Sequence, residues 1–453
     1  MPTVGPTFRS GVHVFSEANR AAPASNIHMF VSAARLVVPL LLTFAVVAQA
    51  APQQPAAAAQ SPGALKVFLD CNSCDEDFLR TEITFIDYMR DRTDADVHVL
   101  VTTQSTGGGG TEYTLKFIGL GRFAGVEQTL KHNQPQTATQ DERRKGLAAT
   151  LKLGLVRYVA ETPLAPKLKV SYEGGADKGQ TTAKRDPWNL WVYQTNVGGS
   201  FNGEESTSSH SLRGSVSAQR TTDAWKLAFE SNYNYRESRF DLGDGTTFRT
   251  VTRNVNQDAL VVKSLTKHWS AAVVESLGSS TFVNYDLRFR IAPGIEYDIF
   301  PYSESTRRLF TVQYTVGYDA FDYHEETIFG KTSEQLADHR LQTSFSMRQP
   351  WGSAFSSVNF SQYLSQPDKY SISAFGETNV RLFKGFSFNV FGEVARTKDQ
   401  IYLPRGEATT EEILVQQRQL ATGYRYFLNF GISYSFGSIY NNVVNPRFGN
   451  NCC

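Results

Sequence analysis

From residue 167 to residue 437 the chain alternates apolar and polar residues, in successive segments of about 10 to 15 residues. In "WKLAFESNYNYR", for example, Trp225, Leu227 and Phe229 occupy alternate positions on one face, and Lys226 and Glu230 lie on the other. Successive side chains of a β-strand point to opposite faces, so this pattern predicts long strands with one aromatic face and one polar face. We find no convincing long helix in this region, and the predicted class is mainly β.

The pattern yields about twelve such strands, and their length is informative. Strands of soluble proteins are usually about 5–6 residues long, whereas about ten tilted residues cross a bilayer. The links after every second predicted strand, such as "TTD" and "KG", are short. The links after the other strands, such as "NGEESTSS" and "YHEETIFGKTSEQLAD", are often longer and polar. The sequence therefore predicts an antiparallel transmembrane β-barrel of about twelve strands at residues 167–437. A large secreted sandwich or propeller is the alternative.

Residues 64–162 differ from the barrel region. "ALKVFLDC", "ADVHVLVTTQST" and "TEYTLKFIGL" predict strands, and "DEDFLRTEITFIDYMRDR" and "DERRKGLAATLKLGLVRYVAET" predict amphipathic helices. The expected order is β-α-β-β-α, which describes a small α+β domain.

The N-terminal residues predict export from the cytoplasm. Arg35 precedes an apolar run from Leu36 to Val47, and Ala48-Gln49-Ala50 follows as a small-x-small cleavage site. We assign residues 1–50 to a signal peptide with the true start at Met29, and an uncleaved anchor is the alternative. Residues 51–63 form a Pro/Ala linker, and residues 438–453 form a C-terminal tail whose role the sequence does not explain.

The net charge of +1 gives no global basic field for nucleic acid. On the polar faces of the predicted strands, charges of both signs occur together. Alternation assigns these residues to the barrel lumen: Arg213, Lys226, Glu230, Arg236, Arg288, Arg290, Glu296, Asp298, Arg340, Arg348, Glu377, Arg381 and Glu393. They indicate either a polar solute path or ion pairs that fill a narrow barrel.

Aromatic residues are abundant on the opposite face. Amphipathic rings suit the interfacial girdles of a membrane barrel, where they lie at the depth of the headgroups. The lipid-facing and girdle assignments are Trp191, Tyr193, Trp225, Tyr233, Tyr235, Tyr314, Tyr318, Phe430, Tyr434 and Phe436.

The chain has four cysteines, too few for a disulfide-built scaffold. Cys71 and Cys74 form a C-x-x-C motif before the first predicted helix, where a redox pair could sit, but the following "DED" disfavours a thiolate. A structural disulfide or two inert thiols is the preferred interpretation. A metal site with His98 lacks a second ligand motif, and "GGGG" lacks the Lys-Ser/Thr of a phosphate loop, so no metal and no cofactor are predicted.

A lipid hydrolase embedded in the barrel is the enzymatic alternative. It would need a serine, a histidine and an acid or amide close together. The histidines of the barrel are His210, His268, His324 and His339. No nucleophile–base pair can be assembled from the strand positions, so an enzyme is not the prediction.

The closing segment "FLNFGISYSF", with alternating aromatics and Phe436 at its end, resembles the C-terminal strand of Gram-negative outer-membrane β-barrel proteins. Here a tail follows that strand. The segment "VFLDCNSCDEDFLRTEITFIDYMRDR" resembles an accessory domain of uncharacterised bacterial barrel proteins. The resemblance implies an outer-membrane location with the α+β domain in the periplasm. The implied partners are outer-membrane lipid, the barrel assembly machinery and an envelope protein, and the implied roles are a pore for small polar solutes or a structural and assembly barrel.

Overall fold

The structure is a computed structural model that describes residues 63–171, 186–241, 243, 245–406, 421–445 and 447. The predicted signal peptide, nearly all of the linker, and Cys452 and Cys453 lie outside the described residues. Within the described ranges, no helix has the length and apolarity that a membrane span requires.

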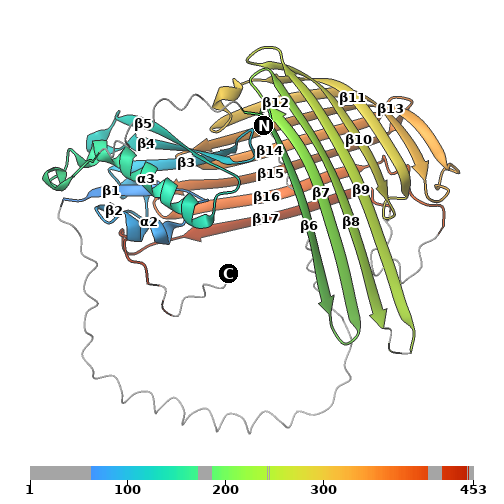
Figure 1. Cartoon of the computed structure of the whole chain (residues 1–453), viewed down its shortest axis with the longest axis horizontal. Coiled ribbons are helices and arrows are strands. Elements are labelled where there is room, and N and C mark those ends of the chain that lie inside the picture. Colours follow the sequence, from blue (N-terminus) through green and yellow to red (C-terminus); the bar gives the residue numbers. More distant parts are fainter. Residues whose placement is uncertain are drawn as a thin grey trace, which may run out of the picture. The chain divides into compact units, whose positions relative to one another are not determined.

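The first region is a five-stranded sheet with two helices. Its elements are β1 (Leu65–Asp70), α2 (Glu76–Glu82), β2 (Ile86–Tyr88), β3 (Val97–Ser105), β4 (Thr111–Gly119), β5 (Glu127–Gln134) and α3 (Gln140–Val159). The strand order is β2-β1-β3-β4-β5, in which β1 runs parallel to β2 and β3, and the other pairs are antiparallel (Figure 1). The predicted small α+β domain is confirmed.

Two details of the α+β domain differ from the prediction. The first helix ends at Glu82, and residues 86–88 form the edge strand β2 instead of continuing the helix. Asp75 caps the helix by accepting a hydrogen bond from the Phe78 N–H at 3.0 Å, but the "ITFI" segment after Glu82 carries β-branched side chains that favour extended backbone. The strand β5, which is polar and half exposed, was not predicted at all.

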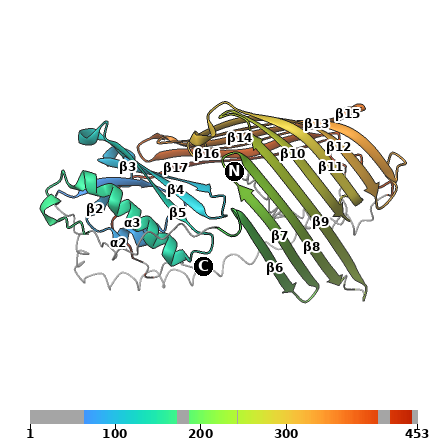
Figure 2. The ribbon, with the colours of Figure 1, turned by 45° about the horizontal axis from the view of Figure 1, so that its top comes forward.

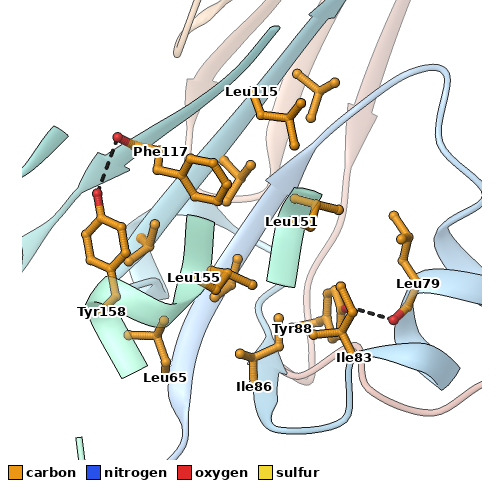
Figure 3. Close-up of a cluster of buried hydrophobic side chains, with 14 of the residues drawn as sticks. Leu65, Leu79, Ile83, Ile86, Tyr88, Leu115, Phe117, Leu151, Leu155 and Tyr158 are labelled. Carbon is orange, nitrogen blue, oxygen red and sulfur yellow. Dashed lines mark hydrogen bonds between the residues drawn. The ribbon is translucent and has the colours of Figure 1, made fainter. Parts of the chain in front are cut away.

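Helix α3 covers one face of this sheet and closes a compact apolar core (Figure 3). Leu115, Phe117 and Leu155 are almost completely buried there. The buried Tyr158 hydroxyl donates to the Val126 carbonyl at 3.1 Å, and the Tyr88 hydroxyl donates to the Leu79 carbonyl at 2.8 Å. These bonds satisfy the polar ends of both rings, so that the rings can be buried without a desolvation penalty.

The second region is a single antiparallel sheet of twelve strands. They are β6 (Trp191–Gly203), β7 (Thr207–Thr221), β8 (Trp225–Asp241), β9 (Thr247–Ser264), β10 (Trp269–Ser280), β11 (Tyr285–Asp298), β12 (Arg308–Tyr323), β13 (Ser333–Gln349), β14 (Gly352–Tyr363), β15 (Gln366–Phe383), β16 (Phe386–Thr397) and β17 (Tyr424–Tyr434). Each strand pairs with its neighbours along the chain, as Figure 2 shows. The predicted class, strand number and antiparallel order are confirmed.

The edge strands β6 and β17 each pair with one neighbour only, and no pairing joins them to each other among the described residues. The sequence predicts that β17 pairs with β6 near Trp191, and the structure does not form this seam. Water can satisfy the free N–H and C=O groups of such edges, whereas hydrocarbon cannot. We therefore expect the seam to close when lipid surrounds the sheet.

The links between strands divide into two sets. At one end of the sheet, called the turn end, lie links 222–224, 265–268, 299–307, 350–351 and 384–385. At the other, called the loop end, lie links 204–206, 242–246, 281–284, 324–332, 364–365 and the link that follows β16. The predicted length difference holds only in part, because the loop-end links 204–206, 281–284 and 364–365 are short, and the turn-end link 299–307 is as long as the loop-end link 324–332. The link after β12 is shorter than expected because β13 already begins at Ser333, which pairs with Asp322.

The tail after Phe436 has a structural role that the sequence did not reveal. Tyr440 forms an antiparallel bridge with Met89, next to the edge strand β2 of the α+β domain. The Asn441 N–H donates to the Tyr88 carbonyl at 2.8 Å, and the side-chain oxygen of Asn442 accepts from the Tyr88 N–H at 2.6 Å. The tail thus covers an edge that would otherwise expose free backbone groups.

Candidate functional site on the polar face of the large sheet

The strand register defines the two faces of the twelve-stranded sheet, because residues that oppose each other in paired strands project to the same side. Gly278 opposes Arg288, and Thr315 opposes Arg340. Followed from strand to strand, the register places all thirteen predicted lumen residues on one face, called the polar face. That this face encloses a lumen stays a prediction.

The strand residues among the predicted lipid-facing side chains lie on the opposite face, called the apolar face. Phe430 is 69% exposed and Tyr318 is 44% exposed, and Phe436 follows the end of β17. A continuous face of exposed aromatic and aliphatic side chains is unfavourable in water and suits contact with lipid.

Five charged residues of β11, β12 and β13 form one network on the polar face, called the Arg/Asp cluster. They are Arg288, Arg290, Asp319, Asp338 and Arg340. Arg288 binds Asp319 through Nε at 3.1 Å and Nη2 at 2.9 Å. Arg290 binds Asp338 through Nη2 at 3.0 Å, and Arg340 Nε donates to the same carboxylate at 2.6 Å.

A glycine makes room for this network. A Cβ atom at Gly317 would lie 2.3 Å from the Asp338 Oδ1 atom and 2.6 Å from the Arg290 Nη2 atom. The guanidinium of Arg290 therefore crosses the strand β12 over the position where any other residue would carry a side chain. The small residue on β12 lets a charge on β11 reach a partner on β13.

Burial makes the Arg/Asp cluster energetically important. The side chains of Arg290, Asp319 and Asp338 are 4%, 0% and 2% exposed, respectively. Charges so deeply buried are tolerated only when they are paired and hydrogen-bonded, and removing one partner costs far more than removing an exposed one.

An aromatic cluster lies on the same side towards the loop end. Phe321, Tyr323, Leu336, Tyr363 and Ile401 are all buried there, and Tyr285 and Tyr402 pack against them. Phe321 and Tyr323 lie at positions of β12 whose side chains project to the polar face. This face therefore becomes aromatic near the loop end. The cluster joins four strands to a segment of the link that follows β16.

That segment, residues 398–405, is held firmly at the loop end. Ile401 is 1% exposed, and the carbonyl of Tyr402 accepts a hydrogen bond from the Asn284 side chain at 2.9 Å. The Leu403 carbonyl accepts from the Ile328 N–H at 2.8 Å. The segment therefore caps the aromatic cluster at the loop end of the polar face.

A cavity of about 400 Å³ lies beside the Arg/Asp cluster and the aromatic cluster. Its lining includes Asn256, Arg288, Arg340, Ser361, Lys369 and Tyr402. A volume of this size accommodates a small organic solute, and the polar lining suits one that carries charge or hydroxyl groups.

The other predicted lumen residues are not gathered into this site. Glu296 accepts a hydrogen bond from Gln313, Glu393 pairs with Arg425, and Arg381 contacts Asp70 of the α+β domain. The remaining ones lie elsewhere on the polar face: Arg213, Lys226, Glu230, Arg236, Asp298, Arg348 and Glu377.

Sequence reasoning missed several residues of the site. Asp319 and Asp338 were not singled out, although both fall on the polar positions of their strands, and this alternation could have identified them. Alternation could not identify the other three residues, which are Tyr363, Lys369 and Tyr402. The first two lie beside an irregularity in the pairing of β14 with β15, and Tyr402 belongs to the link after β16.

The α+β domain meets the turn end of the sheet through charged contacts. Asp70 binds both Nη atoms of Arg381, at 2.6 Å and 2.8 Å, and the same carboxylate lies 3.2 Å from Nε2 of the buried His98. Asp91 accepts a hydrogen bond from the Gly385 N–H at 2.7 Å. The contacts place the short turn between β15 and β16 against this domain.

Acid should weaken this contact. Burial tends to raise the pKa of Asp70, but the hydrogen bonds and charges of Arg381 and His98 outweigh it and lower the pKa to about 2. An unfolded aspartate has a pKa of about 3.9. The contact therefore adds stability above about pH 4, and this contribution is lost as the pH falls through about 2.

We expect Asp70→Asn to remove roughly 2 kcal/mol or less at neutral pH, since water still reaches Arg381. Thermal unfolding of the full chain between pH 2 and pH 5 should then vary less with pH than in the unchanged protein. Asp77→Asn, which changes an exposed carboxylate of α2, is the control. An unaltered pH profile for Asp70→Asn would contradict the assignment.

Cys71 and Cys74 are joined by a disulfide, with their Cα atoms 5.6 Å apart. The bond lies at the start of α2, directly after β1. With both sulfurs in this bond, a thiolate metal site with His98 does not form in the structure.

The four histidines of the barrel region lie in separate environments. His268 Nδ1 lies 2.6 Å from the Asp298 carbonyl, His324 pairs with Asp286, and His339 lies between Tyr314 and Gln362. The His210 ring packs against Phe201. Among the described residues, none of these histidines hydrogen-bonds to a serine hydroxyl.

Comparison with known proteins gives a family match without an activity. Residues 197–400 match the model of DUF481, a family described as a protein of unknown function. No curated protein matches the chain.

Several solved structures are similar to about half of the chain. A NanC porin is 9% identical over 53% of this chain and 99% of its own, with a TM-score of 0.27. The translocator domain of the autotransporter NalP from Neisseria meningitidis is 12% identical over 54% and 82%, with a TM-score of 0.18. The β domain of the Bordetella autotransporter BrkA is 13% identical over 54% and 98%, with a TM-score of 0.23.

Proposed function

We propose that this chain is an outer-membrane β-barrel protein whose polar face forms a path for small polar solutes. The observation that supports it most directly is the cavity of about 400 Å³ beside the Arg/Asp cluster, on the charged face of a twelve-stranded sheet whose other face is aromatic. A barrel with a polar interior and an apolar exterior is the arrangement that conducts solutes through an outer membrane.

The polar lining is compatible with such a path. The buried carboxylates of Asp319 and Asp338 are paired with arginines, so the cluster does not present isolated buried charges. Paired side chains that narrow a barrel can select solutes by size and charge without closing the space between them. The segment 398–405 is held against the aromatic cluster at the loop end and contributes Asp399 and Tyr402 to the cavity lining.

The α+β domain supports the proposed orientation. Its contacts with Arg381 and Gly385 lie at the turn end, and short turns of outer-membrane barrels face the periplasm. We place this domain in the periplasm and the loop end outside the cell. An envelope protein that binds the periplasmic domain remains the predicted partner of a structural or assembly role.

Planar-bilayer recording of the purified full chain tests the path. We expect stepwise ionic currents that are absent when heat-denatured protein is added. Ser361→Trp, which places a large ring on the polar face at the cavity, should reduce the single-channel conductance. The matched control is Phe360→Trp, because the neighbouring residue projects to the apolar face.

Two outcomes would contradict the proposal. A folded, inserted barrel without current at any voltage would exclude the solute path and favour the structural or assembly role. An equal reduction of current by both tryptophan variants would show that the path does not pass the cavity.

A further inference from the structure

The cavity beside the Arg/Asp cluster exposes its cations and hides most of its anions. The side chains of Arg288, Arg340 and Lys369 are 30%, 39% and 22% exposed, whereas those of Asp319 and Asp338 are 0% and 2% exposed. Both carboxylates are bound by arginines and are almost completely buried, so the more exposed charged groups of the cluster are the guanidiniums.

The local charges agree with this picture. The Arg/Asp cluster contains three arginines and two aspartates, which leaves one net positive charge. Lys369 adds an ammonium group on the cavity wall, and its Nζ atom lies 3.6 Å from the Asp368 carboxylate, whose side chain is 73% exposed. Because fixed charges act more strongly near low-dielectric walls, even a small excess of positive charge attracts anions.

Two carboxylates also line the cavity and oppose this attraction: Asp338, which is paired with Arg290 and Arg340, and Asp399. Asp399 belongs to the segment 398–405, outside the strands. Burial raises the pKa of Asp399, which disfavours its charged form relative to an exposed aspartate. Asp399 therefore reduces the excess of positive charge on the cavity wall without cancelling it, because Arg288, Arg340 and Lys369 face the two carboxylates.

The remaining lining supplies neutral contacts. Asn256 and Ser361 provide amide and hydroxyl groups, and the rings of Tyr285, Tyr363 and Tyr402 provide flat surfaces. Guanidinium groups bind planar carboxylates and phosphates through paired N–H donors. The combination fits a small organic solute with an anionic group and a hydroxylated or flat body.

We propose that this cavity binds small anionic solutes that carry a carboxylate or phosphate group, and that the path through the barrel is anion-selective. The proposal rests on the proposed solute path and defines its substrate class. Carboxylate and phosphate share the chemistry that the arginines and Lys369 recognise, so both belong to the test.

The first measurement is the reversal potential of the full chain in a planar bilayer under a potassium chloride gradient. We expect its sign to report a higher permeability for chloride than for potassium. Adding sodium acetate or sodium phosphate should reduce the chloride current as these anions occupy the cavity. Lys369→Glu should move the reversal potential towards cation selectivity.

Lys263→Glu is the matched control, because this lysine lies on the apolar face with its ammonium 4.4 Å from the Trp225 ring. It should leave the reversal potential unchanged. A conducting, cation-selective wild-type protein would overturn the inference while leaving the solute path intact. Equal shifts for both variants would overturn the assignment of selectivity to the cavity.

A second measurement distinguishes the inference from the proposed path. Inorganic phosphate and acetate should each raise the thermal midpoint of the folded full chain, and Lys369→Glu should reduce this rise more than Lys263→Glu does. If the protein conducts no current but shows this difference, the cavity binds anions and only the path is wrong. No rise with either anion in a folded protein would overturn the anion site.

Discussion

Replacing Asp338 by alanine should lower the free energy of unfolding by about 3–5 kcal/mol. The change removes the carboxylate that binds Arg290 and Arg340, and Arg290, with a side chain only 4% exposed, cannot recover its charge–charge interaction from water. The Asp319 Oδ2 atom lies 3.6 Å from the Arg290 Nε atom, but this carboxylate is already bound to Arg288. It therefore offers little replacement for the lost partner of Arg290. Urea unfolding in detergent, followed by tryptophan fluorescence, measures the loss.

Asp322→Ala is the control for this prediction. Asp322 is an exposed aspartate on the neighbouring strand β12, and its position projects to the apolar face. We expect its replacement to change the unfolding free energy only slightly, as most surface substitutions do. Similar losses for both variants would show that the Arg/Asp cluster does not stabilise the sheet.

A positive charge at Phe430 should also be strongly destabilising in a membrane. Phe430 is 69% exposed on the apolar face of β17, in the middle of that strand. An arginine at the bilayer midplane of a barrel costs about 2–4 kcal/mol, so Phe430→Arg should reduce the heat-resistant folded fraction in gel-shift assays.

Ser433→Arg is the matched control, because Ser433 lies on the polar face of the same strand. We expect it to fold with nearly the wild-type yield. If Phe430→Arg folds equally well in lipid vesicles, the assignment of this face to lipid is wrong.

Much of the fold could be predicted because period-two alternation reports on each strand separately. The predicted twelve strands and the faces of residues such as Trp225 and Phe430 required no knowledge of the neighbouring strands. The length of helix α2 was overestimated for a related reason. Apolar residues near Ile83 and Ile86 fit helical spacing, but their β-branched side chains and the parallel pairing with β1 favour a strand.

The site was harder to predict, because its chemistry arises between strands. Arg290 pairs with Asp338 across an intervening strand, and this pairing depends on the inter-strand register and on the absence of a side chain at Gly317. Tyr402 reaches the cavity through a link whose path depends on contacts with Asn284 and Ile328. Alternation alone identifies the charged face, but it does not identify which charges meet or where a cavity remains.

The pairing of the tail with β2 has a consequence for the order of folding. The Tyr88 N–H donates to Asn442, a residue 354 positions later in the chain. The α+β domain is synthesised long before Asn442, so this edge of its sheet stays open until the C-terminal tail reaches it. Closing so large a loop costs conformational entropy, and contacts between distant parts of a chain form slowly. The tail should therefore attach late, after the twelve strands that precede it. Until then, the edge at β2 exposes backbone N–H and C=O groups to which another extended chain can pair.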